Sequence, residues 1–262
     1  MIITSPQNPR MQLVRALLTR RAERDSSRTF VIEGVRLAEE ALSANWTAHL
    51  VLTSSQLSER GREVAAGFAA GGAEVVEVEP RLLEALSGTE SPQGILAVMQ
   101  RTDLPPPAPA NFIVVADGIR DPGNLGTLLR TCNAAGVQAV FLTPGTVDAF
   151  SPKVVRAGMG AHFRLPIHSL DWKKIIRFCR VDSHPPLRLL LAEAAEGTSL
   201  WQADLRAPLA LVIGGEAEGA SPEALSAVDG CVAIPMPGKS ESLNAAVAAA
   251  ILLFEVVRQR TS

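Results

Sequence analysis

Short apolar runs alternate with amphipathic stretches along most of the chain. Uninterrupted apolar runs predict buried strands, and apolar residues that recur every three or four positions predict helices. In the first hundred residues the predicted strands cover 29–32, 49–52, 73–78 and 94–100. The predicted helices cover 10–24, 35–42, 59–69 and 81–86. This alternation favours a mainly parallel sheet with helices on its faces.

A proline-rich segment interrupts the pattern. Residues 102–110 read TDLPPPAPA, with four prolines in nine residues. Proline lacks a backbone N–H and has a fixed φ, so this segment forms neither a helix nor a central strand, and we expect an extended linker. We therefore predict a first domain over residues 1–101, a linker over 102–110 and a second domain over 111–262.

After the linker the alternation becomes stronger. The predicted strands cover 112–116, 137–142, 164–167, 187–192, 209–213 and 232–234. The predicted helices cover 125–135, 152–157 and 172–180, with another that opens at 222 and a long C-terminal helix that begins near 243–244. The last helix is rich in alanine and apolar nearly all round, so we expect it to be buried on most sides. Both halves of the chain are thus predicted to be α/β.

The composition excludes several classes of protein. The hydrophobic fraction is 47%, which is too high for a disordered chain. No uncharged apolar run reaches the length of about 18 residues that a transmembrane helix needs. The first residues lack a basic and then apolar signal peptide, so we expect a cytoplasmic protein. The cysteines form no CxxC pair and the histidines show no ligand spacing, so we expect neither a disulfide nor a metal site.

Positive charge is concentrated near the start of the chain. The whole chain has a net charge of −2, yet residues 1–36 contain seven arginines and three acids. A solvated helix face would explain this composition, and so would a surface that contacts phosphate groups. Six of these residues are the candidates for such contacts: Arg10, Arg15, Arg20, Arg21, Arg28 and Arg36.

Three polar loops follow apolar strands at their carboxyl ends, over residues 117–124, 214–219 and 235–242. In an open parallel sheet this edge is where ligands bind. The polar candidates at these loops and at the helices that follow them are Asn124, Arg130, Glu216, Ser242 and Asn244. Each also has a plain structural interpretation. The asparagines and the serine could cap helices, Arg130 and Glu216 could be surface charges, and the glycines of the second loop could form a tight turn.

Together and in this order, the three loops resemble the SpoU (TrmH-like) family of RNA ribose 2′-O-methyltransferases, within the SPOUT superfamily. The matching residues are Asn124-x-Gly126-x-x-x-Arg130-Thr131 up to Gly136, then Leu211-Val212-Ile213-Gly214-Gly215-Glu216-x-x-Gly219-x-Ser221, then Ile234-Pro235-Met236-x-Gly238 up to Ser242-Leu243-Asn244. The resemblance covers residues 111–262, and residues 30–36 resemble part of the family's small substrate-binding domain. Two positions depart from the family pattern: Cys132 stands where alanine is usual, and Ala246 where serine is frequent.

The resemblance implies a SPOUT domain whose C-terminal segment forms a deep trefoil knot, preceded by a small α/β ribosomal-protein-like domain that binds the substrate. It also implies S-adenosylmethionine as the cofactor and a homodimer through the C-terminal domain. The apolar run 251–254 suits burial at such an interface, although the core of a monomer would also use it. The cofactor contacts that it implies are Thr143, Gly145, Gly214, Gly215, Ile234, Met236 and Leu243.

The same resemblance implies that Arg130 activates the attacking hydroxyl and that Asn124, Glu216, Ser242 and Asn244 orient it and the ribose. Because a guanidinium stays protonated in proteins, electrostatic stabilisation of the developing alkoxide is a sounder role for Arg130 than that of a base.

The leading functional hypothesis is therefore an S-adenosylmethionine-dependent RNA 2′-O-methyltransferase. Ribosomal RNA is favoured over tRNA, because two-domain family members with this N-terminal module commonly act on it. Two alternatives remain open: a tRNA 2′-O-methyltransferase, and a non-catalytic RNA-binding factor for ribosome assembly. Retention of the polar motif residues disfavours the non-catalytic alternative, and the basic N-terminal stretch disfavours a methyltransferase for small molecules.

Overall fold

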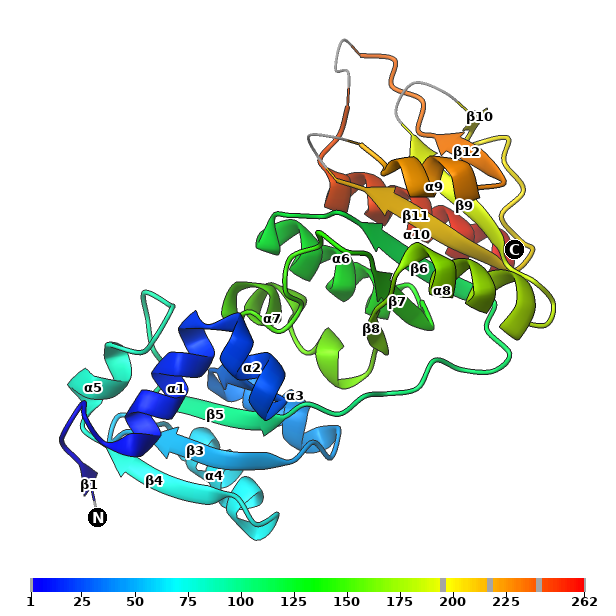
Figure 1. Cartoon of the computed structure of the whole chain (residues 1–262). Helices are drawn as coiled ribbons and strands as arrows, with labels where there is room; N and C mark the ends of the chain where they lie inside the picture. The colour runs from blue at the N-terminus through cyan, green and yellow to red at the C-terminus, as the bar shows by residue number, and fades with distance from the viewer. Residues whose placement is uncertain (1, 194–196, 216–218, 239–241, 262) are drawn as a thin grey trace. The chain divides into compact units, whose positions relative to one another are not determined.

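The computed structural model describes residues 2–193, 197–215, 219–238 and 242–261, and the chain forms two compact units (Figure 1). The first unit contains Met1–Thr102 and Phe150–Phe163, and the second contains Asp103–Ala149 and Arg164–Ser262. Residues 150–163, which the sequence assigns to the second domain, thus cluster with the first unit.

The first unit contains a five-stranded sheet in the order β1-β4-β3-β5-β2. Its strands are β1 (Ile2–Ile3), β2 (Thr29–Glu33), β3 (Ala48–Thr53), β4 (Glu74–Val78) and β5 (Ile95–Gln100). Its helices are α1 (Pro9–Thr19), α2 (Arg21–Ser27), α3 (Val35–Ser43), α4 (Glu59–Ala70), α5 (Pro80–Glu84), α7 (Pro152–Gly158) and the 3-10 helix η1 (Ala161–Phe163).

The prediction of a mainly parallel sheet is wrong for this unit. Strand β5 lies between β2 and β3 and is antiparallel to both. Alternation of strands and helices along a sequence does not determine the direction of a strand that inserts between two earlier ones, and mixed sheets are common.

The helix predicted over residues 10–24 is two helices. Arg20 has an extended backbone, with φ −117° and ψ 116°, and separates α1 from α2. Beyond this break Arg24 is buried and donates a hydrogen bond to the Leu17 carbonyl. Arg24 therefore ties α2 to α1 and does not contribute to the exposed positive surface.

Residues 150–163 complete the core of the first unit. The rings of Phe30 and Phe150 lie 5.1 Å apart, and those of Trp46 and Phe163 lie 5.2 Å apart. Trp46 Nε1 also donates a 3.1 Å hydrogen bond to the Phe163 carbonyl. Such aromatic pairs contribute more than the area they bury, so this segment belongs energetically to the first unit.

The second unit contains a seven-stranded sheet in the order β10-β12-β9-β11-β6-β7-β8, in which neighbouring strands are parallel. Its strands are β6 (Phe112–Asp117), β7 (Ala139–Leu142), β8 (Ile167–Ser169), β9 (Arg188–Glu193), β10 (Thr198–Ser199), β11 (Leu209–Gly214) and β12 (Gly230–Ala233). Its helices are α6 (Pro122–Ala134), α8 (Trp172–Arg177), the π-helix η2 (Phe178–Asp182), α9 (Pro222–Ala227) and α10 (Ala245–Thr261).

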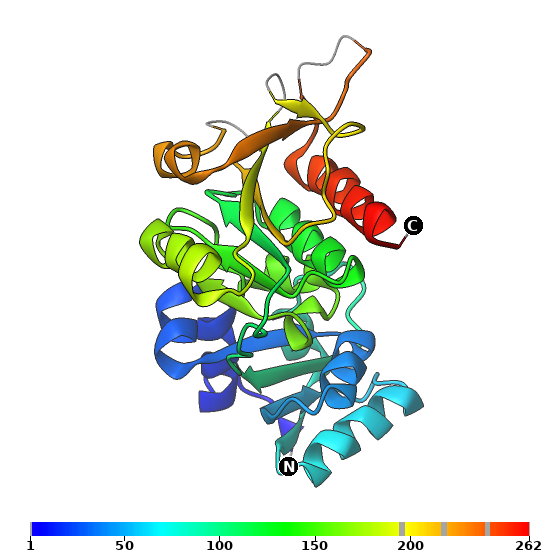
Figure 2. The ribbon, with the colours of Figure 1, turned by 90° about the vertical axis from the view of Figure 1, so that its right-hand side faces the viewer.

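Helices cover both faces of this sheet. Figure 2 shows α6 and α10 on one face and α8 and α9 on the other. The central strands are therefore buried on both sides, which explains why their sequences are continuous apolar runs. The α/β class predicted for both halves is confirmed, whereas the knotted path of the C-terminal segment stays a prediction. Within the described ranges, no helix is long and apolar enough to cross a membrane.

Charged and amide side chains hold the last turns of α10. Glu255 is buried and accepts hydrogen bonds from Arg258, at 2.7 and 2.8 Å, and from Gln259 Nε2, at 2.8 Å. Gln259 in turn accepts a 2.8 Å hydrogen bond from the Leu205 backbone N–H. The hydrogen bonds from Arg258 and then Gln259 lower the pKa of Glu255 from 4.5 to about 2.

We expect the Glu255→Gln variant to have a flatter stability profile in acid than the wild type. Because the pKa of Glu255 is lower in the folded state, the charged carboxylate stabilises the fold above pH 4.5, and this contribution is lost as the pH falls towards about 2. Urea unfolding across this pH range measures the difference between the two proteins. The control is Glu223→Gln, at an exposed position on α9. Parallel profiles for wild type and Glu255→Gln would contradict this role of Glu255.

Candidate functional site

A cavity of about 490 Å³ lies at the carboxyl edge of the second unit's sheet. This volume is within the range of about 300–1,000 Å³ that small-molecule sites occupy. The cavity is lined by Ala192, Glu193, Ile213, Gly214, Gly215, Gly219, Ala220, Val232, Ile234, Met236, Ser242, Leu243, Asn244, Ala245, Ala248 and Leu252.

Strand register explains why these residues meet. In the parallel pairs, Ala192 of β9 lies beside both Ile213 of β11 and Val232 of β12. The segments that follow these three strands therefore leave the sheet at the same level. The start of α10 closes the cavity with Ala245, Ala248 and Leu252.

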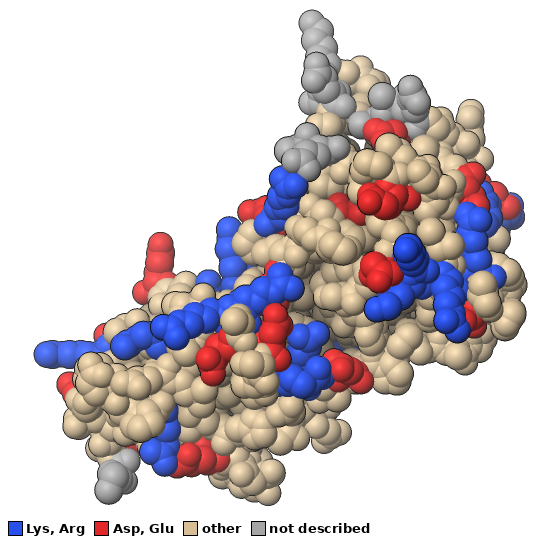
Figure 3. Space-filling model, in the orientation of Figure 1, with Lys and Arg blue, Asp and Glu red and all other residues tan. Residues whose placement is uncertain are grey.

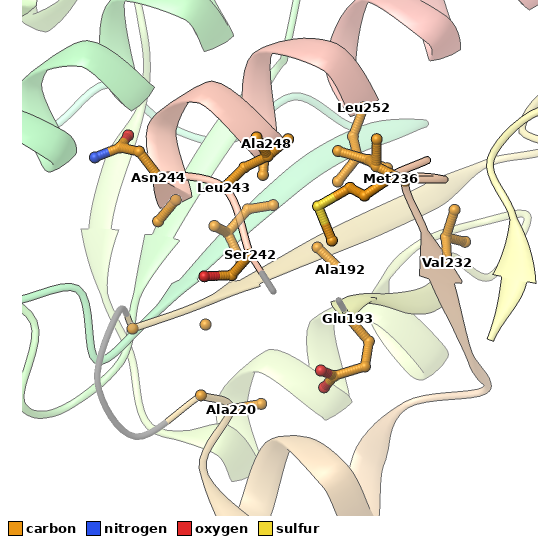
Figure 4. Close-up of a pocket in the computed structure, with 16 residues that line it drawn as sticks. Ala192, Glu193, Ala220, Val232, Met236, Ser242, Leu243, Asn244, Ala248 and Leu252 are labelled. Carbon is orange, nitrogen blue, oxygen red and sulfur yellow. The ribbon is translucent and has the colours of Figure 1, made fainter. Parts of the chain in front are cut away.

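The walls of the cavity are mostly apolar. In Figure 4 the side chains of Met236, Leu243 and Leu252 lie on one side, and the Glu193 carboxylate lies across from them. Among the described lining residues, Glu193 is the one with a charged side chain. Glu193 is not among the residues predicted from the sequence, although an acid at the carboxyl end of a buried strand is a signal that could have identified it.

Most residues predicted to bind the cofactor line this cavity. Gly214, Gly215, Ile234, Met236 and Leu243 do so, and they bring the second and third motifs together. Ser242 and Asn244, which were predicted to act in catalysis, lie at the same wall. The predicted catalytic residue Glu216 lies outside the described residues.

Two predicted cofactor contacts, Thr143 and Gly145, do not line the cavity. The Thr143 side chain is buried and donates a 2.8 Å hydrogen bond to Asp117 Oδ1. Gly145 lines a separate hollow. The strand order gives the reason. Both residues follow β7, whereas the cavity is lined by the end of β11, and β6 lies between these two strands.

A hydrogen bond joins the first motif to the third. Asn244 Nδ2 donates to Asn124 Oδ1 at 2.9 Å, between residues 120 positions apart in the sequence. Asn244 Oδ1 accepts hydrogen bonds from the backbone N–H groups of Ala246, at 3.0 Å, and Val247, at 3.2 Å. Asn244 is thus both a helix cap and a motif partner.

Asn124 does not cap α6. The helix begins at Pro122, and Asp121 is the N-cap, whose Oδ1 accepts a 2.8 Å hydrogen bond from the Asn124 backbone N–H. This leaves the Asn124 side chain for its contact with Asn244, so its capping interpretation is wrong.

Arg130 lies on the exposed surface of α6. No hydrogen bond or ion pair joins its guanidinium to another side chain within the described ranges. It does not line the cavity. The structure therefore places Arg130 on the same helix as Asn124 as a solvent-facing cation.

Asp117, at the end of β6, anchors the loops around the site. Its buried carboxylate accepts hydrogen bonds from Thr143 Oγ1 at 2.8 Å, Trp172 Nε1 at 3.2 Å and the Ser221 backbone N–H at 2.7 Å. Thr143 follows β7, Trp172 is the first residue of α8, and Ser221 precedes α9. From the sequence, Asp117 was placed in the first loop and was not predicted to have this role.

The second loop needs glycine at two positions. A Cβ at Gly214 would lie 2.9 Å from the Ala220 nitrogen, and a Cβ at Gly215 would lie 2.7 Å from the Gly118 carbonyl oxygen. Real Cβ atoms do not approach backbone that closely, so Gly214 lets the backbone at Gly219 and Ala220 pack against the end of β11, and Gly215 lets the chain after β11 pack against the loop after β6.

The second unit has a parallel sheet with a cavity of small-molecule size at its carboxyl edge. A glycine-rich loop borders this cavity, and the polar Asn124–Asn244 pair adjoins it. This is the architecture of an α/β enzyme that binds a nucleotide-like cofactor. Comparison with family models specifies the class. The model of the SpoU rRNA Methylase family matches residues 111–254, and the model of the MRM3-like substrate binding domain matches residues 8–97. The chain belongs to the SpoU rRNA methylase family, which confirms the resemblance drawn from the three motifs.

Several relatives match over nearly the whole chain. The 23S rRNA (guanosine(2553)-2′-O)-methyltransferase RlmP of Bacillus subtilis is 32% identical over 256 residues, which cover 97% of this chain and 98% of the relative. The 23S rRNA (uridine(2479)-2′-O)-methyltransferase of Streptomyces viridochromogenes is 32% identical, and the match covers 99% of this chain and 93% of the relative.

Solved structures agree with these matches. The AdoMet-bound rRNA methyltransferase from Sinorhizobium meliloti has a TM-score of 0.89 and 31% identity, with 100% of this chain and 99% of that chain covered. The SpoU methyltransferase AviRb from Streptomyces viridochromogenes, in complex with AdoMet, has a TM-score of 0.86 and 29% identity, with 97% and 99% covered. Both neighbours contain the cofactor that was expected from the sequence.

We expect Asp117→Ala to destabilise the protein by about 3 kcal/mol, because it leaves two buried donors and one partly buried donor without their acceptor. Urea unfolding measures this loss. The matched control is Asp182→Ala, which removes an exposed ion pair with Arg177 and should cost less than about 1 kcal/mol. Equal stability of the two variants would show that Asp117 is not an anchor.

Proposed function

We propose that this protein transfers a methyl group from S-adenosylmethionine to the ribose 2′-hydroxyl of a nucleotide in ribosomal RNA. The observation that carries the proposal is the 2.9 Å hydrogen bond between Asn244 and Asn124. It joins Asn124 of the first motif to Asn244, which lines the cavity together with residues of the second motif.

The cavity fits an adenosyl cofactor. Its apolar side chains, with Met236, Leu243 and Leu252 among them, suit a flat base, and the backbone at Gly214 and Ile234 offers polar groups to its edges. Glu193 places a negative charge in the same cavity, which suits a cationic ligand. When bound, S-adenosylmethionine supplies a methyl group on an already activated sulfonium, so the protein mainly has to orient the attacking hydroxyl.

In this proposal Arg130 supplies positive charge at the reacting oxygen. A ribose hydroxyl is a weak nucleophile at neutral pH, and negative charge develops on its oxygen as its proton leaves. The exposed guanidinium of Arg130 stabilises that charge or an adjacent phosphate. Asn124 Nδ2 is a hydrogen-bond donor held in place by the contact of Asn124 Oδ1 with Asn244, and it orients the ribose together with Ser242 and Glu216.

The first unit binds the RNA. Figure 3 shows Lys and Arg side chains gathered in a row on the face where α1 and α2 lie. Of the six candidate residues, Arg15, Arg20, Arg21, Arg28 and Arg36 are exposed. The sixth, Arg10, is partly buried and pairs with Glu74 at 2.5 Å. Exposed arginines provide the sequence-independent attraction to phosphates that RNA binding requires.

The rRNA substrate is proposed because the 32% identical relative from Bacillus subtilis is named as a 23S rRNA methyltransferase and matches over both units. We place the reaction in the cytoplasm, as the sequence analysis expected.

We also propose that the protein is a homodimer through α10. Leu252 and Leu253 of the apolar run are 1% and 0% exposed and belong to the core of the second unit. In contrast, Val247 and Phe254 are each 49% exposed, and Ile251 between them is half-buried. These three residues lie on one face of the helix, where a second copy of the chain would bury them.

Arg130→Ala is expected to reduce methyl transfer to rRNA by about a hundredfold or more, as the loss of one charge-stabilising donor does in other enzymes. Transfer of labelled methyl from S-adenosylmethionine to unmodified 23S rRNA measures it, and a tRNA sample run in parallel tests the alternative substrate. Cofactor affinity should not change, because Arg130 does not line the cavity.

Two further variants sharpen this test. Arg130→Lys keeps the positive charge and should retain part of the activity if the role is electrostatic. Arg177→Ala removes another exposed arginine of the second unit and should leave transfer unchanged. If wild type and Arg130→Ala transfer methyl equally well, the catalytic assignment is wrong. If the wild type binds the cofactor but methylates no RNA, the non-catalytic alternative holds.

Phe254→Glu is expected to convert the dimer into a folded monomer, because a charge at the centre of an apolar interface would be buried without a partner. Light scattering during size-exclusion chromatography at micromolar concentration measures the mass. The control is Leu225→Glu, at a 56% exposed apolar position on α9. A monomeric wild type would rule out the interface.

A further inference from the structure

A second hollow adjoins the cofactor cavity, at the carboxyl ends of β6, β7 and β11. Its volume is about 300 Å³. It shares Gly215, Gly219 and Ala220 with the cofactor cavity, so the loop after β11 borders both spaces. Gly145 and Gly215, for which the resemblance implied cofactor contacts, both line this hollow.

Bare backbone forms much of its wall. Gly118, Gly145 and Gly219 line it, and each has a positive φ, of 69°, 89° and 68° respectively. A Cβ added at any of these three positions would meet no atom within 4 Å. Glycine therefore serves the backbone conformation here and also keeps side chains out of the open space beside it.

Hydrogen bonds to Asp117 and Thr143 hold the walls of the hollow in place. The Asp117 carboxylate accepts hydrogen bonds from Thr143, two residues before Gly145, and from the backbone N–H of Ser221, two residues after Gly219. The Gly118 N–H donates to Thr143 Oγ1 at 3.1 Å. This network makes the hollow a built feature of the fold, because it joins the three loops that form its sides.

One positively charged side chain among the described residues lies at the hollow. Arg120 is exposed, and it is the cationic residue among the described residues that line this space. Its backbone is fixed between Ile119, which is 1% exposed, and Asp121, which caps α6. Arg120 is four residues before Asn124, so the loop that borders the hollow leads directly into the first turn of α6, where Asn124 lies.

We propose that this hollow receives the base of the target nucleotide and that Arg120 binds the phosphate beside that nucleotide. The inference rests on the proposed function. A ribose that presents its 2′-hydroxyl at the cofactor cavity carries a base and phosphates, and these need an adjacent space. Flat backbone walls suit an unstacked base, and a guanidinium suits a phosphate through paired N–H donors.

The test compares Arg120→Glu and Arg120→Lys with the wild type. We expect Arg120→Glu to raise the KM for unmodified 23S rRNA about tenfold. We expect the KM of Arg120→Lys to be close to that of the wild type, because the positive charge is kept. The slope of log binding constant against log salt concentration for the same RNA should fall by about one in Arg120→Ala, as expected for a lost phosphate contact. Calorimetric binding of S-adenosylmethionine should be the same in all variants, which also shows that they are folded.

The matched control is Arg206→Glu, at another exposed arginine of the second unit. It should leave both the KM for rRNA and the salt dependence unchanged. An Arg120→Glu variant with wild-type KM and salt slope would overturn the proposal. If wild-type protein transfers no methyl to rRNA, the proposed function fails, and the salt slope of RNA binding still tests the contact of Arg120 with phosphate.

Discussion

Parallel strand pairing at one sheet edge is the constraint on which the rest of the second unit depends. Because β6, β9, β11 and β12 run in the same direction and end at the same level, the segments that follow them meet in space. The Asp117 carboxylate then fixes where these loops go, through donors from three other elements. A buried carboxylate keeps three such bonds only if every donor stays in position, so it couples the loops to one another.

Recognition and chemistry are divided between backbone and side chains. Gly215, directly after β11, allows the loops after β6 and β11 to pack at backbone distance, and a cavity lies on either side of it. The polar side chains gather where α6 and α10 begin, and the Asn124–Asn244 hydrogen bond joins them. Since Asn244 also caps α10, the position of the helix that closes the cavity of about 490 Å³ is linked directly to the first motif.

The first unit depends on a segment that follows it in the chain. Phe150 and Phe163 pack on Phe30 and Trp46, so the sheet of the first unit obtains part of its core from residues beyond the linker. Arg24 has a comparable structural role, because its guanidinium is buried against the Leu17 carbonyl. The remaining positive surface is therefore smaller than the number of arginines in the sequence indicates.

The sequence by itself determined the α/β class of both halves, the position of most strands and helices, and the three loops that resemble the SpoU family. These features are local: buried parallel strands require continuous apolar runs, and proline and glycine mark where such runs stop. Only the tertiary structure decided the direction of β5, the placement of residues 150–163 and the anchoring role of Asp117. It separated Thr143 and Gly145 from the cavity that Gly214 and Leu243 line. It also paired Asn124 with Asn244, which lie 120 residues apart. Such contacts depend on strand order and long-range packing, which no local pattern in a single sequence encodes.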